Sequence, residues 1–232
     1  MKFLSPALTL IACIMLMQGT ALAEEHSVSK YTETSPSMNM EISWQRFGIP
    51  GPDQDADDVV RQAIKHFRAE AAQEWDSQQE LAKEQPDFSP RLCEMTMEGT
   101  LSVNAKTAGM LWKCYRYMGG AHGDLSLFSR NYTIADGRPF SLTDLFRHPE
   151  KALKIMSRLS RKQLSQRDIP QDMAEGGTTP EKENFQTFLL EERGLTIYFS
   201  PYQVAPWSEG VVTVTLTLDE LRDAEPIMTY WK

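Results

Sequence analysis

The prediction of the fold starts from the stretch Cys114-Tyr115-Arg116-Tyr117-Met118-Gly119-Gly120-Ala121-His122-Gly123-Asp124. Up to Tyr117 its side chains alternate as in a β-strand, and the alternation then breaks into glycines around a single histidine. Further strand patterns lie on both sides, and two helical patterns lie apart from them, so that strands and helices occur in blocks. This arrangement predicts an α+β fold with a mainly antiparallel sheet, built from hairpins and packed with two main helices.

The two helices are predicted from apolar side chains that recur every three or four residues. Val60, Ile64 and Phe67 belong to the first helix, which follows a possible aspartate cap and ends before Pro86. Pro149 suits the first position of the second helix. We expect both helices to pack with the sheet.

The strands are predicted from alternation and from the turns between them. We expect strands at 38–44 and 128–134, a hairpin between 92 and 117 with its turn centred on 106 and 107, a hairpin at 185–199, and a strand at 211–216. Residues 171–182 carry two glycines and a proline, and they are predicted to form a mobile loop.

The N-terminus has the layout of a secretory signal. Lys2 precedes an apolar run that ends near Ala21-Leu22-Ala23, which predicts a signal peptide over residues 1–23 and a periplasmic or extracellular protein. Lipidation at Cys13 is the less favoured alternative. Residues 24–37 are predicted to be a flexible leader, followed by a strand-helix module at 38–90 and a C-terminal domain at 91–232 packed with it as one unit.

The charge balance restricts the choice of partners. The sequence has 24 Lys and Arg against 32 Asp and Glu, and removal of the signal takes away Lys2, which leaves about nine net negative charges. Binding a polyphosphate needs a basic surface, so nucleic acid is excluded as a partner, whereas a cationic partner is compatible. No later stretch has the length of a membrane span, and we expect none after signal cleavage.

Two cysteines remain after the signal, and an exported chain with one pair predicts a Cys93–Cys114 disulfide. A plain hairpin centred on 106 and 107 would separate the two sulfurs by ~20 Å along the ladder, so the bridge requires a bulge near Gly99 or a Cys93 that precedes the strand. No metal or cofactor is expected, because zinc takes four ligands and no histidine lies at ligand spacing from either cysteine.

The candidate functional residues are one histidine, one carboxylate and three aromatic side chains. His122 with Asp124 could serve as a general base or metal ligand in a hydrolase or a metal-dependent enzyme, although the flanking glycines favour a tight turn shaped by His122. Tyr115, Tyr202 and Trp207 lie near predicted loops or strand ends, where ligands are often contacted, and core packing is their alternative role. Nucleophile elbows, zinc-protease motifs and phosphate loops are absent from the sequence, so a non-enzymatic protein is preferred.

Four pieces in this order resemble the extracytoplasmic domain of unknown function in RsiV-like lysozyme-sensing anti-sigma factors and PdaC-like peptidoglycan deacetylases. The pieces are Tyr115-Arg116-Tyr117-Met118-Gly119-Gly120-Ala121-His122-Gly123, Asp136-Gly137-Arg138-Pro139-Phe140-Ser141-Leu142-Thr143-Asp144-Leu145-Phe146, Asn184-Phe185, and Tyr198-Phe199-Ser200-Pro201-Tyr202-Gln203-Val204-Ala205-Pro206-Trp207-Ser208-Glu209-Gly210. They cover about residues 91 to 221.

The resemblance implies an exported envelope module that binds or senses a ligand, such as a cell-wall glycan or a lysozyme-like protein. We expect neither anti-sigma activity nor deacetylation, because the sequence lacks a sigma-binding segment and a deacetylase catalytic domain. The family supplies no agreed catalytic residues. A purely structural envelope protein is the remaining alternative.

Overall fold

The computed structural model describes residues 26–232; the predicted signal peptide and Cys13 lie outside the described residues. Its regular elements are β1 (Val28–Thr34), β2 (Met38–Gln45), α1 (Pro50–Glu84), β3 (Cys93–Val103), β4 (Thr107–Tyr117), β5 (Asp124–Thr133), β6 (Pro139–Phe140), η1 (Leu142–Leu145), α2 (Pro149–Leu164), α3 (Gln171–Gly176), η2 (Lys182–Phe185), β7 (Phe188–Glu191), β8 (Gly194–Phe199), η3 (Trp207–Glu209), β9 (Val212–Thr217), η4 (Arg222–Ala224) and η5 (Met228–Tyr230). Among residues 26–232, no helix is long and apolar enough to cross a bilayer.

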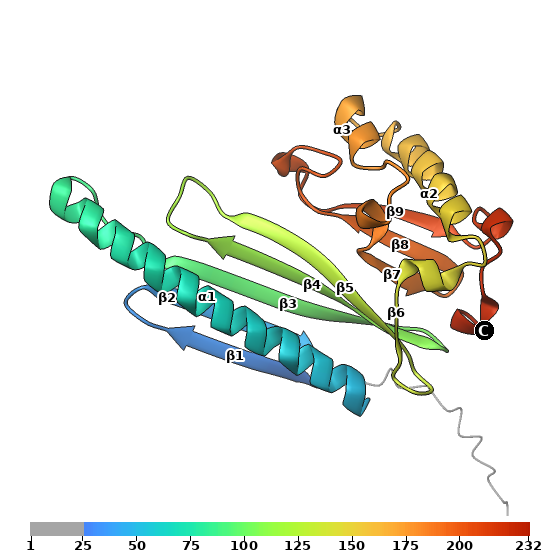
Figure 1. Ribbon diagram of the computed structural model, residues 1–232, viewed down its shortest axis with the longest axis horizontal. Helices are drawn as coiled ribbons and strands as arrows, with labels where there is room; N and C mark the ends of the chain where they lie inside the picture. Colours follow the sequence, from blue (N-terminus) through green and yellow to red (C-terminus); the bar gives the residue numbers. More distant parts are fainter. Residues whose placement is uncertain (1–25) are drawn as a thin grey trace, which may run out of the picture.

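The first sheet has six strands in the order β1 to β6, and α1 crosses one of its faces (Figure 1). The predicted stripe of α1 is buried, as Phe67 shows, and it packs on alternate side chains of the strands such as Met40 and Met97. β2 and β3 are parallel because α1 connects them, and the other neighbours in this sheet are antiparallel.

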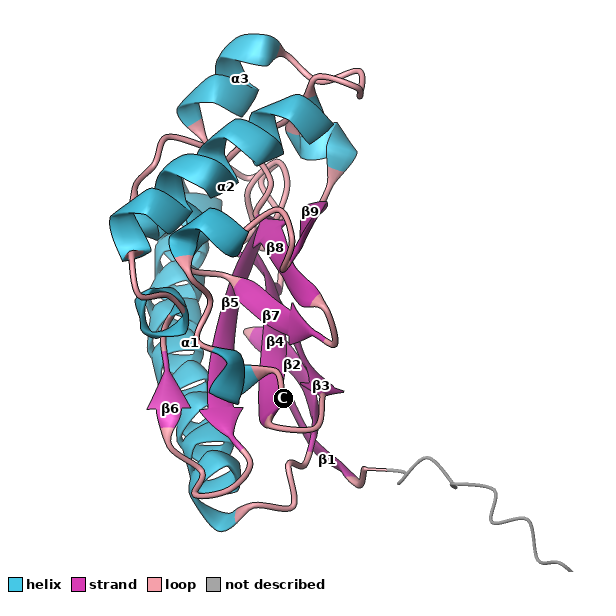
Figure 2. Ribbon diagram, turned by 90° about the vertical axis from the view of Figure 1, so that its right-hand side faces the viewer, coloured by secondary structure: helices cyan, strands magenta, loops and turns pink. Residues whose placement is uncertain are grey.

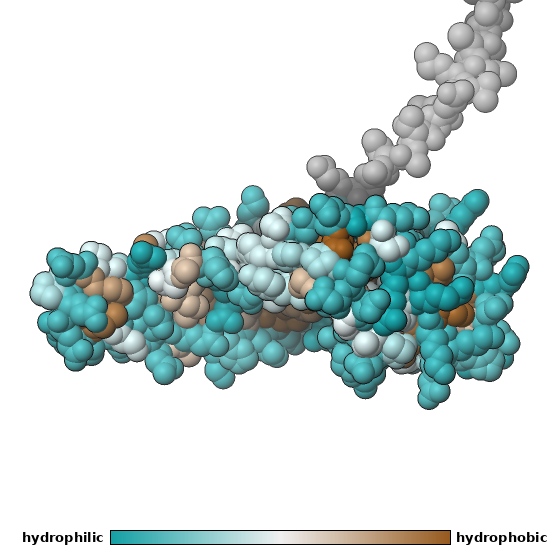
Figure 3. All heavy atoms as spheres, turned by 90° about the horizontal axis from the view of Figure 1, so that it is seen from above, coloured by the Kyte–Doolittle hydropathy of each residue, from teal (hydrophilic) through white to brown (hydrophobic). Residues whose placement is uncertain are grey.

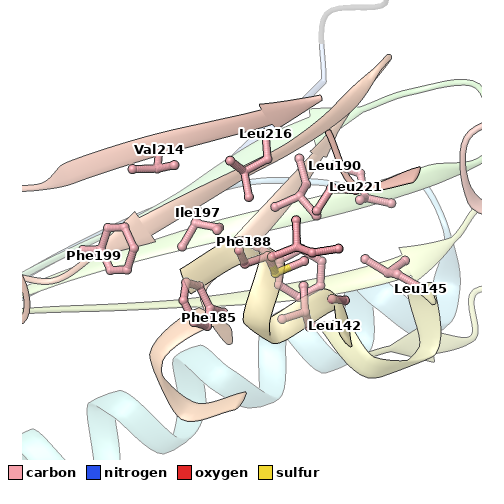
Figure 4. Packing of buried hydrophobic residues seen from close by; sticks show 14 of the residues in the cluster. Leu142, Leu145, Phe185, Phe188, Leu190, Ile197, Phe199, Val214, Leu216 and Leu221 are labelled. Atoms are coloured by element: carbon pink, nitrogen blue, oxygen red, sulfur yellow. The ribbon is translucent and has the colours of Figure 1, made fainter. Parts of the chain in front are cut away.

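The second sheet has three antiparallel strands in the order β7, β8, β9. α2 and α3 lie beside it, and the helices of the molecule gather on one side of the strands (Figure 2). Ile197 and Phe199 of β8 pack with Phe185 of η2 in a second core (Figure 4). The predicted α+β fold with mainly antiparallel pairing and two main helices is confirmed, with the strands divided between two sheets.

The two cores define two modules. One buried cluster draws its residues from 38 to 132 and the other from 140 to 231, so we call residues 26–138 the first module and 139–232 the second module. The boundary expected after residue 90 falls between α1 and β3, whose side chains share the first core.

The modules meet where β7 lies against β5. Asn131 is only 5% exposed, and its Nδ2 donates to the Phe188 carbonyl over 3.0 Å. The Phe188 N–H donates to Ser129 Oγ, also over 3.0 Å. β7 is an edge strand of the second sheet, and in the described chain no strand pairs with its outer edge. Side chains of β5 therefore supply the hydrogen bonds that the main chain of β7 needs on this edge.

The expected flexible leader at 24–37 is wrong over most of its described length, because Val28–Thr34 forms β1, paired antiparallel with β2. Tyr31 and Glu33 also bind Arg68 of α1, which holds the strand on the helix side. The expected loop at 171–182 is likewise wrong, since it contains α3, and Thr178 Oγ1 just after this helix donates to the Ala174 carbonyl over 2.6 Å.

The predicted disulfide is also wrong, because Cys93 and Cys114 are both free thiols in the first core. The ladder pairs Met97 with Cys114 and runs without a bulge to Glu94 and Tyr117. Cys93 thus lies four residues from the position opposite Cys114, ~13 Å along the strand and too far for a disulfide. Burial raises the pKa of both thiols.

Candidate functional site

The loop between β4 and β5, residues 118–123, is anchored to the end of α1. Gln78 is only 5% exposed, and its Oε1 accepts a hydrogen bond from the Arg91 N–H over 2.7 Å. Its amide lies against Gly119, whose φ of +81° is unfavourable for other residues. The Arg91 guanidinium donates to the Tyr117 hydroxyl (3.2 Å) and to the Gly120 carbonyl (3.3 Å). The loop is therefore fixed by side chains outside it.

Tyr115 lies at the base of this loop, with its ring on Gly123. A Cβ added at residue 123 would fall well inside 3.0 Å of the Tyr115 ring, so only glycine allows this approach. Gly123 is buried beneath the ring, and the adjacent His122 is exposed. The second glycine of the Gly-Ala-His-Gly piece thus makes room for Tyr115 and brings His122 to the surface.

The two ring nitrogens of His122 differ in their hydrogen bonds within residues 26–232. Its Nδ1 lies 2.8 Å from the Gly123 carbonyl, which can only accept, so Nδ1 carries the proton. No hydrogen bond to Nε2 occurs within residues 26–232, and this nitrogen is an acceptor in the neutral ring. The imidazole and the Trp207 indole have centroids 5.8 Å apart, with their planes 32° from parallel.

Trp207 and Tyr202 come from the connection between β8 and β9 in the second module. Their ring centroids are 6.0 Å apart and their planes 33° from parallel. In Figure 1 the loop after β4 lies at the upper left of the first sheet, on the side where this connection of the second module approaches it. We call Tyr202, Trp207 and His122 the aromatic row.

Tyr202 has the most unusual backbone of the row. Its φ of +68° lies in the left-handed region, which costs an aromatic residue about 1–2 kcal/mol. The turn is closed by the Tyr202 N–H, which donates to the Ala205 carbonyl over 3.0 Å. The side chain is 56% exposed, so burial of the ring does not explain the strain.

The face of the first sheet opposite α1 continues from Tyr115 as an open polar surface. Side chains alternate along a strand, so the buried residues of β3 face α1 and those between them face solvent. This face carries the exposed acids Glu41, Glu94 and Glu98, and the half-buried Lys113 lies opposite Glu98. Seen from above, the molecule is mainly hydrophilic, with small separate hydrophobic patches (Figure 3).

The four residues predicted from the sequence to bind a ligand therefore lie together: Tyr115, His122, Tyr202 and Trp207. The structure does not assemble the alternative catalytic pair, His122 with Asp124. No hydrogen bond joins His122 to Asp124 within residues 26–232, and Asp124 lies opposite Arg116 in the ladder. The same part of the chain has no group of three or more His, Cys, Asp and Glu side chains that could hold a metal. Gln78 and Arg91 were missed, because their contacts with the loop leave no local sequence pattern.

Over part of its length the chain is similar to a family described as having unknown function. Residues 143–219 match the family model described as "Protein of unknown function (DUF3298)". The peptidoglycan-N-acetylmuramic acid deacetylase PdaC of Bacillus subtilis (strain 168) is 28% identical over 165 residues, which cover 69% of this chain and 35% of the relative. The chain thus spans about a third of that relative's length.

Two solved structures share the fold. A DUF3298 family member from Bacteroides fragilis NCTC 9343 superposes with a TM-score of 0.64 at 16% identity, covering 86% of this chain and 92% of that one. A DUF3298 family protein from Pseudomonas aeruginosa PAO1 gives 0.60 at 13% identity, covering 89% and 96%. The PdaC-like part of the expected resemblance is supported, and the RsiV-like part stays a prediction.

Proposed function

We propose that this chain, which carries a DUF3298 domain over residues 143–219, is an exported envelope protein that binds a cell-wall glycan through the aromatic row without catalysing a reaction on it. The observation that carries the proposal is the meeting of His122 from the first module with Trp207 and Tyr202 from the second. The predicted signal peptide and the relative named as a peptidoglycan-N-acetylmuramic acid deacetylase support an envelope role.

The chemistry of the row suits a sugar chain. Pyranose rings present flat C–H faces that pack on aromatic rings, and their hydroxyls need hydrogen-bond partners at the edge of the contact. Trp207 and the exposed ring of Tyr202 offer the faces, and the free Nε2 of His122 offers an acceptor. The strained backbone of Tyr202 also supports a binding role, because strain that packing does not explain is concentrated at functional sites.

A cationic wall-directed protein, such as a lysozyme, is a second candidate ligand. The formal net charge is −8, and the open face of the first sheet exposes Glu41, Glu94 and Glu98. Such a surface would speed the association of a basic protein, although charge by itself contributes little to specificity. The hydrolase alternative has less support, because His122 binds the Gly123 carbonyl and is not hydrogen-bonded to Asp124 within residues 26–232.

The test is co-sedimentation of the mature protein with insoluble peptidoglycan, comparing wild type with Trp207→Ala and Tyr202→Ala. We expect each substitution to weaken binding about tenfold, as truncation of an aromatic anchor commonly does. Trp75→Ala is the matched control, because this half-buried tryptophan lies on α1 outside the row. Circular dichroism establishes that each variant is folded.

Two outcomes would contradict the proposal: a wild-type protein that stays in the supernatant, or a Trp207→Ala protein that sediments like wild type. Binding of hen lysozyme, measured in parallel for wild type and for Glu94→Gln with Glu98→Gln, distinguishes the second candidate. The protein ligand would be favoured if the wild type binds lysozyme, the glutamine variant does not, and neither protein binds peptidoglycan.

A further inference from the structure

A cleft of about 570 Å³ lies between the modules, apart from the aromatic row. β5 forms one wall, β6 with the start of η1 forms another, and the segment from η2 to β7 forms the third. Buried Phe140, Leu142 and Phe188 contribute apolar lining, whereas Ser141 and Gln186 are exposed. A cleft of this volume between two units has the usual size and place of a small-molecule site.

The charge of the cleft is opposite to that of the whole chain. Within residues 26–232, Arg130 and Lys182 are the charged residues of the lining, and no Asp or Glu of this range belongs to it. Their side chains are 54% and 71% exposed, so they remain available to a ligand. Each has an acid at the edge of ion-pair range, Asp55 at 3.7 Å from Arg130 Nε and Glu183 at 3.7 Å from Lys182 Nζ. The side chain of Arg130 makes no hydrogen bond within residues 26–232, so its terminal guanidinium nitrogens are free to donate.

The cleft also reaches an unpaired length of strand edge. β6 pairs only with Asn131 and Tyr132, although β5 begins at Asp124. The Thr133 N–H donates outward across this edge to the Arg138 carbonyl. Because main-chain groups alternate along a strand, those of Ser129 point to the same edge, where no strand of the described chain pairs with them. Ser129 is a lining residue, so an amide of a ligand can bond there.

We propose that this cleft is a second binding site, independent of the aromatic row, for a small ligand that carries a carboxylate and an amide. The carboxylate lies between Arg130 and Lys182, and the amide pairs with the main chain of Ser129. An N-acylated acidic sugar and a short acidic peptide both have this chemistry.

The test is an NMR titration of the ¹⁵N-labelled mature protein with matched pairs of probes. N-acetylmuramic acid is compared with N-acetylglucosamine, which lacks its lactyl carboxylate, and acetyl-Ala-Glu-Ala-amide is compared with acetyl-Ala-Gln-Ala-amide. We expect saturable shifts at the amides of Ser129 and Thr187 with at least one acid and not with its neutral partner. The arm that responds identifies the source of the carboxylate.

The double variant Arg130→Gln with Lys182→Gln should weaken that binding about tenfold or more. The control, Lys151→Gln with Lys154→Gln, removes two exposed charges of α2 outside this cleft and should bind like wild type. Equal shifts with the acidic and neutral probes, no shifts with any probe, or unchanged binding by the double variant would overturn the proposal. Trp207→Ala should leave these shifts intact, so failure of peptidoglycan binding and failure of the cleft are separate results.

Discussion

The ring of His122 lies 5.8 Å from the ring of Trp207, so the loop after β4 in the first module meets η3 of the second. Neither module alone supplies the row: the first contributes the imidazole, and the second contributes Trp207 and Tyr202. Besides the contacts of Gln78 and Arg91 with the loop, the row depends on two anchors, the packing of the loop on Tyr115 and the junction between β5 and β7. Both can be perturbed without touching the row.

Gly123→Ala tests the first anchor. The new Cβ would collide with the Tyr115 ring, and such overpacking costs about 1–3 kcal/mol. We expect a lower free energy of unfolding in urea, and weaker peptidoglycan binding because His122 is displaced with the loop.

A double-mutant cycle identifies the collision as the cause. In a Tyr115→Ala background the ring is absent, so Gly123→Ala should lose most of its effect on stability. Gly120→Ala is the control, since no atom of residues 26–232 lies within 4 Å of a Cβ at that position. An equal cost of Gly123→Ala in both backgrounds would show that the ring contact is not responsible.

Asn131→Ala tests the second anchor. The substitution leaves the buried Phe188 carbonyl without its side-chain donor, which should cost about 1–3 kcal/mol in urea unfolding. Asn39→Ala removes only an exposed hydrogen bond with Thr34 and should cost less than about 0.5 kcal/mol. Equal costs for the two substitutions would indicate that the junction does not depend on Asn131.

Local patterns predicted much of this fold. The stripe Val60, Ile64 and Phe67 specified α1, because every third or fourth side chain of a helix shares a face. β1 was missed because it is an edge strand whose exposed and half-buried residues alternate only weakly in polarity. α3 was missed because it is short and ends at Gly176, with Gly177 and Pro180 close behind it, a composition that resembles a loop.

The disulfide prediction failed because it required a bulge near Gly99 or a Cys93 that precedes the strand, whereas the ladder has no bulge and Cys93 is the first residue of β3. Asn104 Oδ1 accepts from the N–H groups of Lys106 and Thr107, so the turn lies one residue earlier than expected and every partner shifts by two, which brings the cysteines closer but leaves them too far apart to bond. The aromatic row is a different case. Each member stood out in the sequence as a candidate, but their meeting depends on how two modules pack, and no local pattern records that.

The two thiols give a direct chemical prediction. The unfolded, unreduced mature protein should titrate with two free sulfhydryls per chain, because Cys93 and Cys114 are both free. In the folded protein both should react slowly with the same reagent, since burial raises their pKa and keeps them as neutral thiols. Finding no free sulfhydryl in the unfolded chain would restore the disulfide.

Asp144 gives a pH-dependent prediction at the edge of the second module. The Ser141 hydroxyl and then its N–H donate to Oδ2, each over 2.7 Å, and they lower the pKa of this carboxyl. A lowered folded-state pKa contributes stability above the unfolded value of about 3.9, and this stability is lost as the pH falls. Asp144→Asn should therefore be less stable than wild type at pH 7 by urea unfolding, and the gap should shrink at pH 3. A gap that stays constant with pH would contradict this origin.

Substitution of Tyr202 by glycine should raise the stability of the fold and weaken ligand binding at the same time. Glycine adopts a positive φ freely, so Tyr202→Gly should relieve the strain and raise the free energy of unfolding by up to about 1 kcal/mol after its own entropic cost. For a chain of this size that corresponds to a rise in Tm of roughly 2–4 °C. Tyr202→Ala removes the same ring without relieving the backbone, and it serves as the matched variant. Both should lose peptidoglycan binding to the same extent, and only the glycine variant should be stabilised. If both variants unfold at the same temperature, the backbone of Tyr202 is unstrained and the argument from strain to binding fails.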